Sequence, residues 1–464
     1  MANVHAVSGS PRAALSRKPD AQSGDTALSE AAIRRTAFRL LPFLLLLYVC
    51  AFIDRVNVGI AALQMNRDLK LSAAAYGFGS SIFFVGYAFL EVPSNLILAR
   101  VGARRWIARI MITWGLLAAG MMFVRGATSF YILRFVLGAA EGGFFPGIVF
   151  YLAGFFPASH RARAVSRFML AIPLANVLSG LLAGPLLGLQ GELGLAGWQW
   201  LFLLEGLPAA MLGVIVLLVL PDTPADARWL SESERVALVR RLRAEREETL
   251  HHDISSVGAA LMNARVWQLG LIWGAMYLVA NAYTFWAPQL IQGYFGRSAG
   301  WTGNALAVIA LAAGVAMFVS GVHSDRTRER SLHIAVPFGL ATAAWLLVAS
   351  PLPAAWRFAG LALAAVSIPC LYGPFWCVPA SFLSGDAEAG GLALISSIGA
   401  FCGFIGPNVL GIAQRVTGSQ RVGFVVIASV AALGALMTVL LKSVKRPTLI
   451  AVNANGTSDA KARR

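Results

Sequence analysis

The feature that most constrains this chain is a series of long apolar windows separated by short charged stretches. A window of about 18–25 apolar residues is long enough to cross the hydrocarbon core of a bilayer as a helix. Six such windows precede a charged central stretch and six follow it. The predicted spans are 39–62, 75–99, 107–125, 128–157, 166–189, 198–220, 266–291, 301–322, 332–350, 356–383, 390–414 and 422–441.

The composition agrees with a membrane protein. Hydrophobic residues make up 58% of the chain and charged residues 13%, whereas a soluble domain carries about 25% charged residues. We expect an all-α integral membrane protein whose twelve transmembrane helices form two pseudo-symmetric six-helix halves. The halves cover 39–220 and 266–442, an amphipathic cytoplasmic linker covers 221–265, and cytoplasmic tails cover 1–38, which is expected to be disordered, and 443–464.

Basic residues gather on one side of the predicted membrane, in the tails, the linker and the loops after the second, fourth and eighth spans, whereas the loop after the tenth span has none. This distribution predicts that both termini are cytoplasmic in a bacterial-type inner membrane. The net charge of +16 does not indicate a nucleic-acid partner, because the basic residues lie beside apolar spans and not on a soluble basic face. The four cysteines lie in apolar windows without metal-ligand spacing, so neither a metal nor a cofactor is expected.

Four ionisable residues lie inside predicted spans, Asp54 and Arg55 in the first and Arg134 and Glu141 in the fourth. Charges at this depth are costly unless they are paired or face a water-filled path, so they mark a candidate pathway. Arg55 offers a planar fork for a carboxylate. Asp54 and Glu141 are candidate proton carriers, because a carboxyl group sealed in low dielectric has its pKa raised towards neutrality. The alternative is a static set of opposite charges that holds the two spans together.

Geometry within each helix separates these side chains. Adjacent residues point about 100° apart, so Asp54 and Arg55 cannot face the same partner. Residues seven positions apart point in almost the same direction from a helix axis, so Arg134 and Glu141 share one helix face. Glu91 and Glu205 are interpreted as structural residues near span ends, where interfacial water or a helix-end partner suffices.

Aromatic and neutral polar residues inside other spans can line a cavity that hydrogen-bonds hydroxyl groups and packs a carbon skeleton. Taken alone, an aromatic residue in a span is more often a packing or interface residue. The candidates for substrate contact besides Arg55 are Tyr87, Asn281, Tyr283, Trp376 and Ser396.

Two matching loops are candidate cytoplasmic gates, after the second and the eighth spans. In both, a turn is followed by basic residues, which can pair with acidic groups or carbonyl ends of a neighbouring helix and release them when the halves move. Simple orientation of the chain by basic loops is the alternative explanation. The gate candidates are Arg100, Gly102, Arg104, Arg105, Gly321, Asp325 and Arg326.

These loops resemble the G-x-x-x-D-R-x-G-R-R signature of the major facilitator superfamily. The second copy keeps Gly321, Asp325 and Arg326, whereas the first has Ala99 in place of the aspartate. Further short motifs are similar to those of the anion:cation symporter branch of that superfamily, such as Phe52-Ile53-Asp54-Arg55-Val56-Asn57 and Gly197-Trp198-Gln199-Trp200. The resemblance extends from about residue 40 to 440.

The resemblance implies that the charged positions of spans one and four serve anion binding and proton coupling. By analogy with the superfamily, Arg134 orders its helix and tunes Glu141. The predicted function is proton-coupled uptake of a small carboxylate, tartrate-like or another sugar acid, by a monomer in a lipid bilayer. An antiporter or exporter, with an aromatic carboxylate as the other substrate class, is the alternative. An enzyme is not expected, because no nucleophile, metal set or clustered acid and base is evident.

Overall fold

The computed structural model describes residues 19–251, 258, 261–379, 383 and 385–441, and these residues form helices joined by short turns. The first half contains α1 (Pro19–Asp68), α2 (Ala73–Val101), α3 (Ala103–Gly120), α4 (Ala127–Glu141), α5 (Phe144–Phe155), α6 (Ala158–Met169), α7 (Ala171–Gly188) and α8 (Gly197–Val219). The linker helix is α9 (Glu232–His251). The second half contains α11 (Ala264–Phe295), α12 (Ala299–Thr327), α13 (Ser331–Ala349), α14 (Ala354–Ser367), α15 (Tyr372–Trp376), α16 (Gly385–Thr417) and α17 (Arg421–Leu440).

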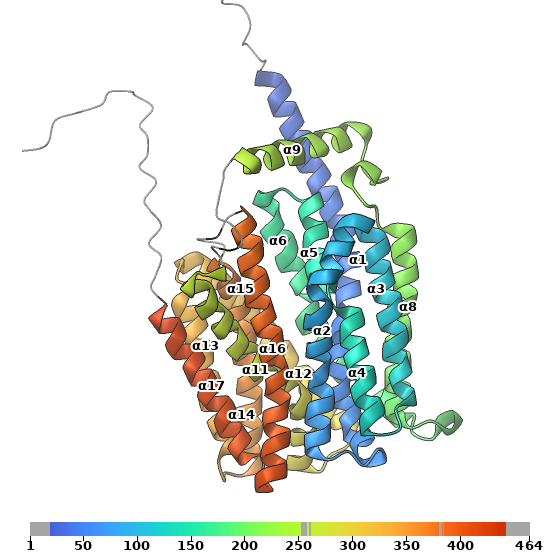
Figure 1. Ribbon diagram of the computed structural model, residues 1–464, viewed down its shortest axis with the longest axis vertical. Coiled ribbons are helices and arrows are strands. Elements are labelled where there is room, and N and C mark those ends of the chain that lie inside the picture. The colour runs from blue at the N-terminus through green and yellow to red at the C-terminus, as the bar shows by residue number, and fades with distance from the viewer. Residues whose placement is uncertain (1–18, 252–257, 259–260, 380–382, 384, 442–464) are drawn as a thin grey trace, which may run out of the picture.

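The described helices confirm the predicted class of fold, with six spans in each half (Figure 1). Eleven helical segments of the described chain are long and apolar enough to cross a membrane. The remaining span is α11, whose 32 residues include tryptophan, tyrosine and amide side chains that lower its mean hydropathy. The same polar and aromatic residues make α11 a helix suited to lining a cavity rather than facing lipid alone.

Three predicted spans are not single helices. The fourth breaks between α4 and α5 at Gly142 and Gly143, and Gly143 adopts the left-handed region with φ +90°. A side chain at Gly143 would overlap Ser94 of α2, so the break lets two helices approach closely. The fifth span divides into α6 and α7 at Leu170, and the tenth runs as α14, a 3₁₀ turn (Ile368–Leu371) and α15. Residues 380–382 of the predicted tenth span lie outside the described residues.

The expectation of a disordered tail is wrong for residues 19–38, which form the start of α1. Ion pairs with the linker helix stabilise this extension. Asp25 pairs with Arg240, Glu30 pairs with Arg241, and Arg35 lies 2.9 Å from Glu234. Ala237 and Leu238 of α9 are buried beneath these pairs. The sequence therefore continues the first span as an amphipathic helix that docks the linker onto the first half. Residues 1–18 and 442–464 lie outside the described residues.

The helices of the two halves lie close together at the end distant from α9 (Figure 1), and glycines form several of the contacts between the halves. A Cβ built on Gly180 of α7 would lie 2.6 Å from the carbonyl oxygen of Gly303 on α12, and one built on Gly59 of α1 would lie 2.7 Å from the carbonyl oxygen of Thr284 on α11. Small residues permit such backbone contact between membrane helices. In this structure the halves are thus tightly packed at the end opposite the linker.

Candidate functional site

A cavity lies between the two halves, and its walls come from α1, α2 and α7 on one side and α11, α12, α14, α15 and α16 on the other. The structure brings all six predicted substrate residues to this cavity, namely Arg55, Tyr87, Asn281, Tyr283, Trp376 and Ser396. Asp54, Arg134 and Glu141 are buried behind the wall inside the first half. The spacing argument for the first span therefore describes its geometry correctly, since Arg55 faces the cavity and Asp54 does not.

Arg55 is held at the cavity wall by Glu141 and by three rings. Its guanidinium forms an ion pair with Glu141 of α4. It also lies over the rings of Phe52 and Tyr87, at 5.1 Å and 5.4 Å from their centroids, and over Phe83 at 5.5 Å. The Arg55 side chain is 12% exposed and that of Glu141 is 2% exposed. The arginine is thus the partner that reaches the cavity, and the carboxylate fixes it from behind.

Arg134 is fully buried two turns before Glu141 on α4. Its guanidinium donates a hydrogen bond to the Ser80 carbonyl oxygen at 2.9 Å and lies 4.7 Å from the centroid of the Phe83 ring. These contacts join α4 to α2, and the Phe83 ring is contacted by the guanidinium groups of both Arg134 and Arg55. Arg134 consequently contributes positive charge near Glu141 from inside the bundle, without lining the cavity.

Glu91 and Glu205 are both more enclosed than their positions near predicted span ends suggest. Glu205 lies inside α8 and is 7% exposed, and Glu91 of α2 is 8% exposed. The Glu91 carboxylate accepts a hydrogen bond of 3.4 Å from Ser396 of α16, which joins the two halves beside the cavity. Interfacial water therefore does not account for either carboxylate, and the earlier interpretation is wrong on that point.

The second half supplies an aromatic wall, of which the sequence analysis found Trp376 but not the other three residues. Trp273 of α11 packs edge-on against Trp376 with centroids 4.6 Å apart, and contacts Tyr277 and Tyr372 at 5.4 Å and 6.0 Å. All four residues line the cavity. A signal was present, because Trp273, Tyr277 and Asn281 recur every four residues and so share one face of a helix. Aromatic residues are so common in membrane spans that this spacing alone was not decisive.

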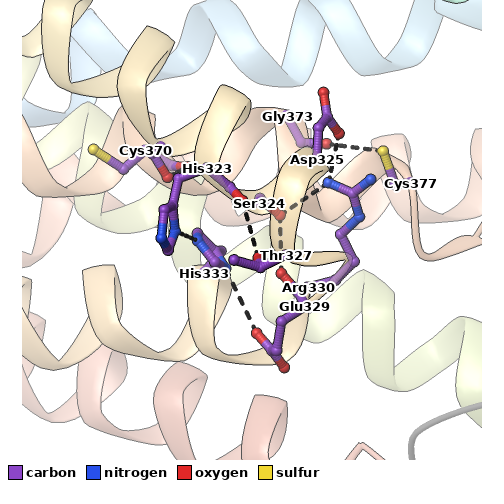
Figure 2. A network of polar contacts seen from close by, with 11 residues as sticks. His323, Ser324, Asp325, Thr327, Glu329, Arg330, His333, Cys370, Gly373 and Cys377 are labelled. Carbon is purple, nitrogen blue, oxygen red and sulfur yellow. Dashed lines mark hydrogen bonds and ion pairs between the residues drawn. The ribbon is translucent and has the colours of Figure 1, made fainter.

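The second gate loop is organised by the ion pair of Arg330 with Asp325, by a histidine pair and by a contact of 3.5 Å between His333 and Glu329 (Figure 2). Arg330 lies 2.8 Å from Asp325 and donates a hydrogen bond to Ser324, at the junction of α12 and α13. Beside them the rings of His323 and His333 are joined by a hydrogen bond of 2.7 Å. Asp325 thus pairs with Arg330, whereas Arg326 is exposed and Gly321 has open space around its Cα.

In the first gate loop, a carboxylate from another part of the chain takes the place of the aspartate that the loop itself lacks. Asp222, just after α8, lies 3.2 Å from the Arg104 guanidinium and accepts a hydrogen bond from the Arg104 amide at 3.1 Å. Gly102 has φ +97° and brings its backbone close to the same carboxylate. Arg100 and Arg105 are exposed. Both gate ion pairs join elements of a single half, so neither acts here as a latch between the halves.

Comparison with known proteins places this geometry in a family. The model of the Major Facilitator Superfamily matches residues 44–407. The chain belongs to the major facilitator superfamily. It is therefore a multi-pass membrane transporter and not an enzyme.

Relatives and solved structures agree with this assignment. The chain is 46% identical over 411 residues to a protein of Agrobacterium vitis named "Putative tartrate transporter", covering 88% of this chain and 91% of the relative. It is 41% identical to "Putative metabolite transport protein NicT" of Pseudomonas putida, covering 89% and 95%. A partially occluded inward-open structure of the xylose transporter XylE from E. coli has the same fold, with a TM-score of 0.70, 15% identity and coverage of 89% and 98%.

Proposed function

We propose that this chain carries a small organic carboxylate together with a proton across a bacterial-type inner membrane, into the cytoplasm that holds both termini. The observation that carries the proposal is the position of Arg55. Among the described residues that line the cavity, Arg55 alone bears a positive charge, and its counter-ion Glu141 is sealed behind it. A guanidinium presented in this way fits the planar carboxylate of a substrate.

Coupling follows from competition for the same guanidinium. A substrate carboxylate that binds Arg55 displaces Glu141, which then lies in an apolar environment without its cation. An unpaired buried carboxylate is relieved by taking up a proton. The substrate anion then replaces the charge of Glu141 on Arg55, and the proton neutralises the displaced carboxylate. Anion and proton therefore enter the occluded state together.

For the substrate itself, we propose a tartrate-like hydroxy acid or another sugar acid. Asn176, Asn281 and Ser396 on the cavity wall can hydrogen-bond hydroxyl groups. Relatives named as tartrate transporters support this class. The aromatic wall around Trp273 favours the second candidate, an aromatic carboxylate whose ring packs between Tyr277 and Trp376.

The function is tested by uptake of labelled tartrate, galactonate, phthalate and hydroxyphenylacetate into proteoliposomes, with and without an inward proton gradient. We expect one acid to accumulate above its external concentration, and this accumulation to collapse when a protonophore removes the gradient. Uptake that occurs only in exchange for internal substrate, whatever the gradient, would instead support an antiporter.

Alternating access adds a prediction for the glycine contacts between the halves. In Gly180→Leu the new side chain meets the Gly303 carbonyl and the Ala307 amide, whose atoms lie 2.6 Å and 2.8 Å from the built Cβ. We expect the closed end to be wedged apart and the uptake rate to fall by about 5- to 150-fold, since overpacking of this kind costs roughly 1–3 kcal/mol. Gly188→Leu on the same helix is the matched control, because nothing lies within 4 Å of its Cβ. Equal rates in the two variants would show that this contact does not limit transport.

A further inference from the structure

Two carboxylates lie inside the first half, away from the cavity and without a cation beside them. Asp54 of α1 is 2% exposed and Glu205 of α8 is 7% exposed. Within the described part of the chain, one oxygen of Asp54 and both oxygens of Glu205 have no hydrogen-bond partner, and neither side chain takes part in an ion pair. Buried charges that lack a partner are expensive, and such a carboxylate is relieved when a proton neutralises it.

The surrounding groups also leave polar atoms unused. Asn57, one turn after Asp54, donates from Nδ2 to Asp54 Oδ1 at 3.4 Å, while its own Oδ1 is buried without a partner. Asn57 also lies next to the Glu205 carboxylate. The indole of Trp114 on α3 is fully buried near Asp54, and its Nε1 donates to no acceptor of the described structure. Donors therefore lie around the two carboxylates, while one oxygen of Asp54 and both oxygens of Glu205 stay without a partner in hydrogen-bonding geometry.

Among the described residues, the charged groups found around Asp54 are two carboxylates and one guanidinium. Glu205 of α8 and Glu141 of α4 repel the charge of Asp54, and Arg134 of α4 attracts it. The 18 residues of α7, which packs against α1 and α8, include no ionisable side chain. Because two like charges cannot both persist at short range in a dry interior, one of the two carboxylates has to be neutral.

We propose that Asp54 and Glu205 share one proton and form a second proton site of the transporter, separate from the pair of Arg55 and Glu141. This inference rests on the proposed function, because it identifies a group that carries part of the coupled proton flux. With one shared proton, the negative charge of the pair and of Glu141 balances the positive charges of Arg55 and Arg134. Asp54 directly precedes Arg55 on α1, so the charge of the pair acts on the helix that holds the substrate.

The site is tested by the number of protons that move with each anion. Proteoliposomes are held at zero membrane potential, and the internal to external substrate ratio is measured at steady state in a tenfold proton gradient. Losing one coupled proton lowers this ratio by about tenfold, which corresponds to about 1.4 kcal/mol of driving force. We expect that decrease in Glu205→Gln and no decrease in Glu192→Gln, a control carboxylate exposed in the turn between α7 and α8.

A double variant tests whether the proton is shared. Asp54→Asn and Asp54→Asn/Glu205→Gln should show the same single tenfold decrease as Glu205→Gln, because only one proton is lost in each. A hundredfold decrease in the double variant would overturn sharing and indicate two independent sites. Asp54→Asn also provides the test if Glu205→Gln does not fold, which size-exclusion chromatography reveals.

Two further outcomes would overturn the site while leaving the proposed function standing. A wild-type ratio in a folded Glu205→Gln protein would show that Glu205 carries no coupled proton. A ratio that follows an imposed sodium gradient, and loses this dependence in Glu205→Gln, would identify a cation site in place of a proton site. Failure of the proposed function is different, because the wild-type protein itself would then show no gradient-driven accumulation.

Discussion

Arg55→Lys is expected to weaken substrate binding by roughly 10- to 100-fold, the equivalent of losing a charged hydrogen bond of about 1.5–3 kcal/mol. Lysine keeps the positive charge but cannot present two parallel donors to a carboxylate. It also loses the flat contact with the rings of Phe52 and Tyr87. The dissociation constant of the substrate identified in the uptake panel, measured by calorimetry on detergent-solubilised protein, checks the expectation.

A matched control exists for this substitution. Arg357 lies 4.4 Å from the centroid of the Tyr294 ring but does not line the cavity, so Arg357→Lys removes a similar stacking contact elsewhere. The affinity of the Arg357→Lys protein for substrate should stay within about twofold of wild type, which is a change of about 0.4 kcal/mol in the binding free energy. If Arg55→Lys also bound substrate with unchanged affinity, the carboxylate would have to be recognised by another group, and the competition between substrate and Glu141 would be lost as a mechanism.

The class of fold was predictable because membrane spans leave a strong signal, a long window without charge. The breaks within spans were not. The interruption at Gly143 depends on the close approach of Ser94 from another helix, which no local pattern reports. The extension of α1 before residue 39 depends on ion pairs with α9, more than 180 residues away in the chain. In each case a tertiary contact decides the local structure.

The candidate site was predictable where helix geometry alone determines direction. The 100° between neighbouring residues separates Arg55 from Asp54, and the structure shows the same separation. Prediction failed where a partner comes from a distant part of the chain. Asp222 provides the carboxylate that Ala99 lacks in the first gate, and Glu205 is buried inside the first half although its position suggested a solvated helix end. The proton and substrate roles of these residues stay predictions.

Glu141→Gln is expected to remove one coupled proton and so weaken concentrative uptake, while substrate exchange across the membrane persists. Glutamine has the shape of a protonated glutamate, so it cannot cycle between charged and neutral forms. It also releases Arg55 from its counter-ion, because the ion pair between Arg55 and Glu141 is lost. At zero membrane potential and in a tenfold proton gradient, the steady-state internal to external ratio should therefore fall by about tenfold, since the proton carried by Glu141 no longer drives the step. Counterflow and gradient-driven uptake, measured in the same proteoliposomes, separate these two activities.

The pH dependence of binding gives an independent test of this role. In the wild-type protein, ionised Glu141 competes with the substrate for Arg55, so affinity should rise as the pH falls and Glu141 becomes protonated. In Glu141→Gln this competition is absent, and affinity should be high and less dependent on pH. Glu192→Gln, which alters an exposed carboxylate, should keep the wild-type profile. A wild-type profile in Glu141→Gln would mean that another group releases Arg55, and the buried ion pair would then be structural, which is how many such pairs behave.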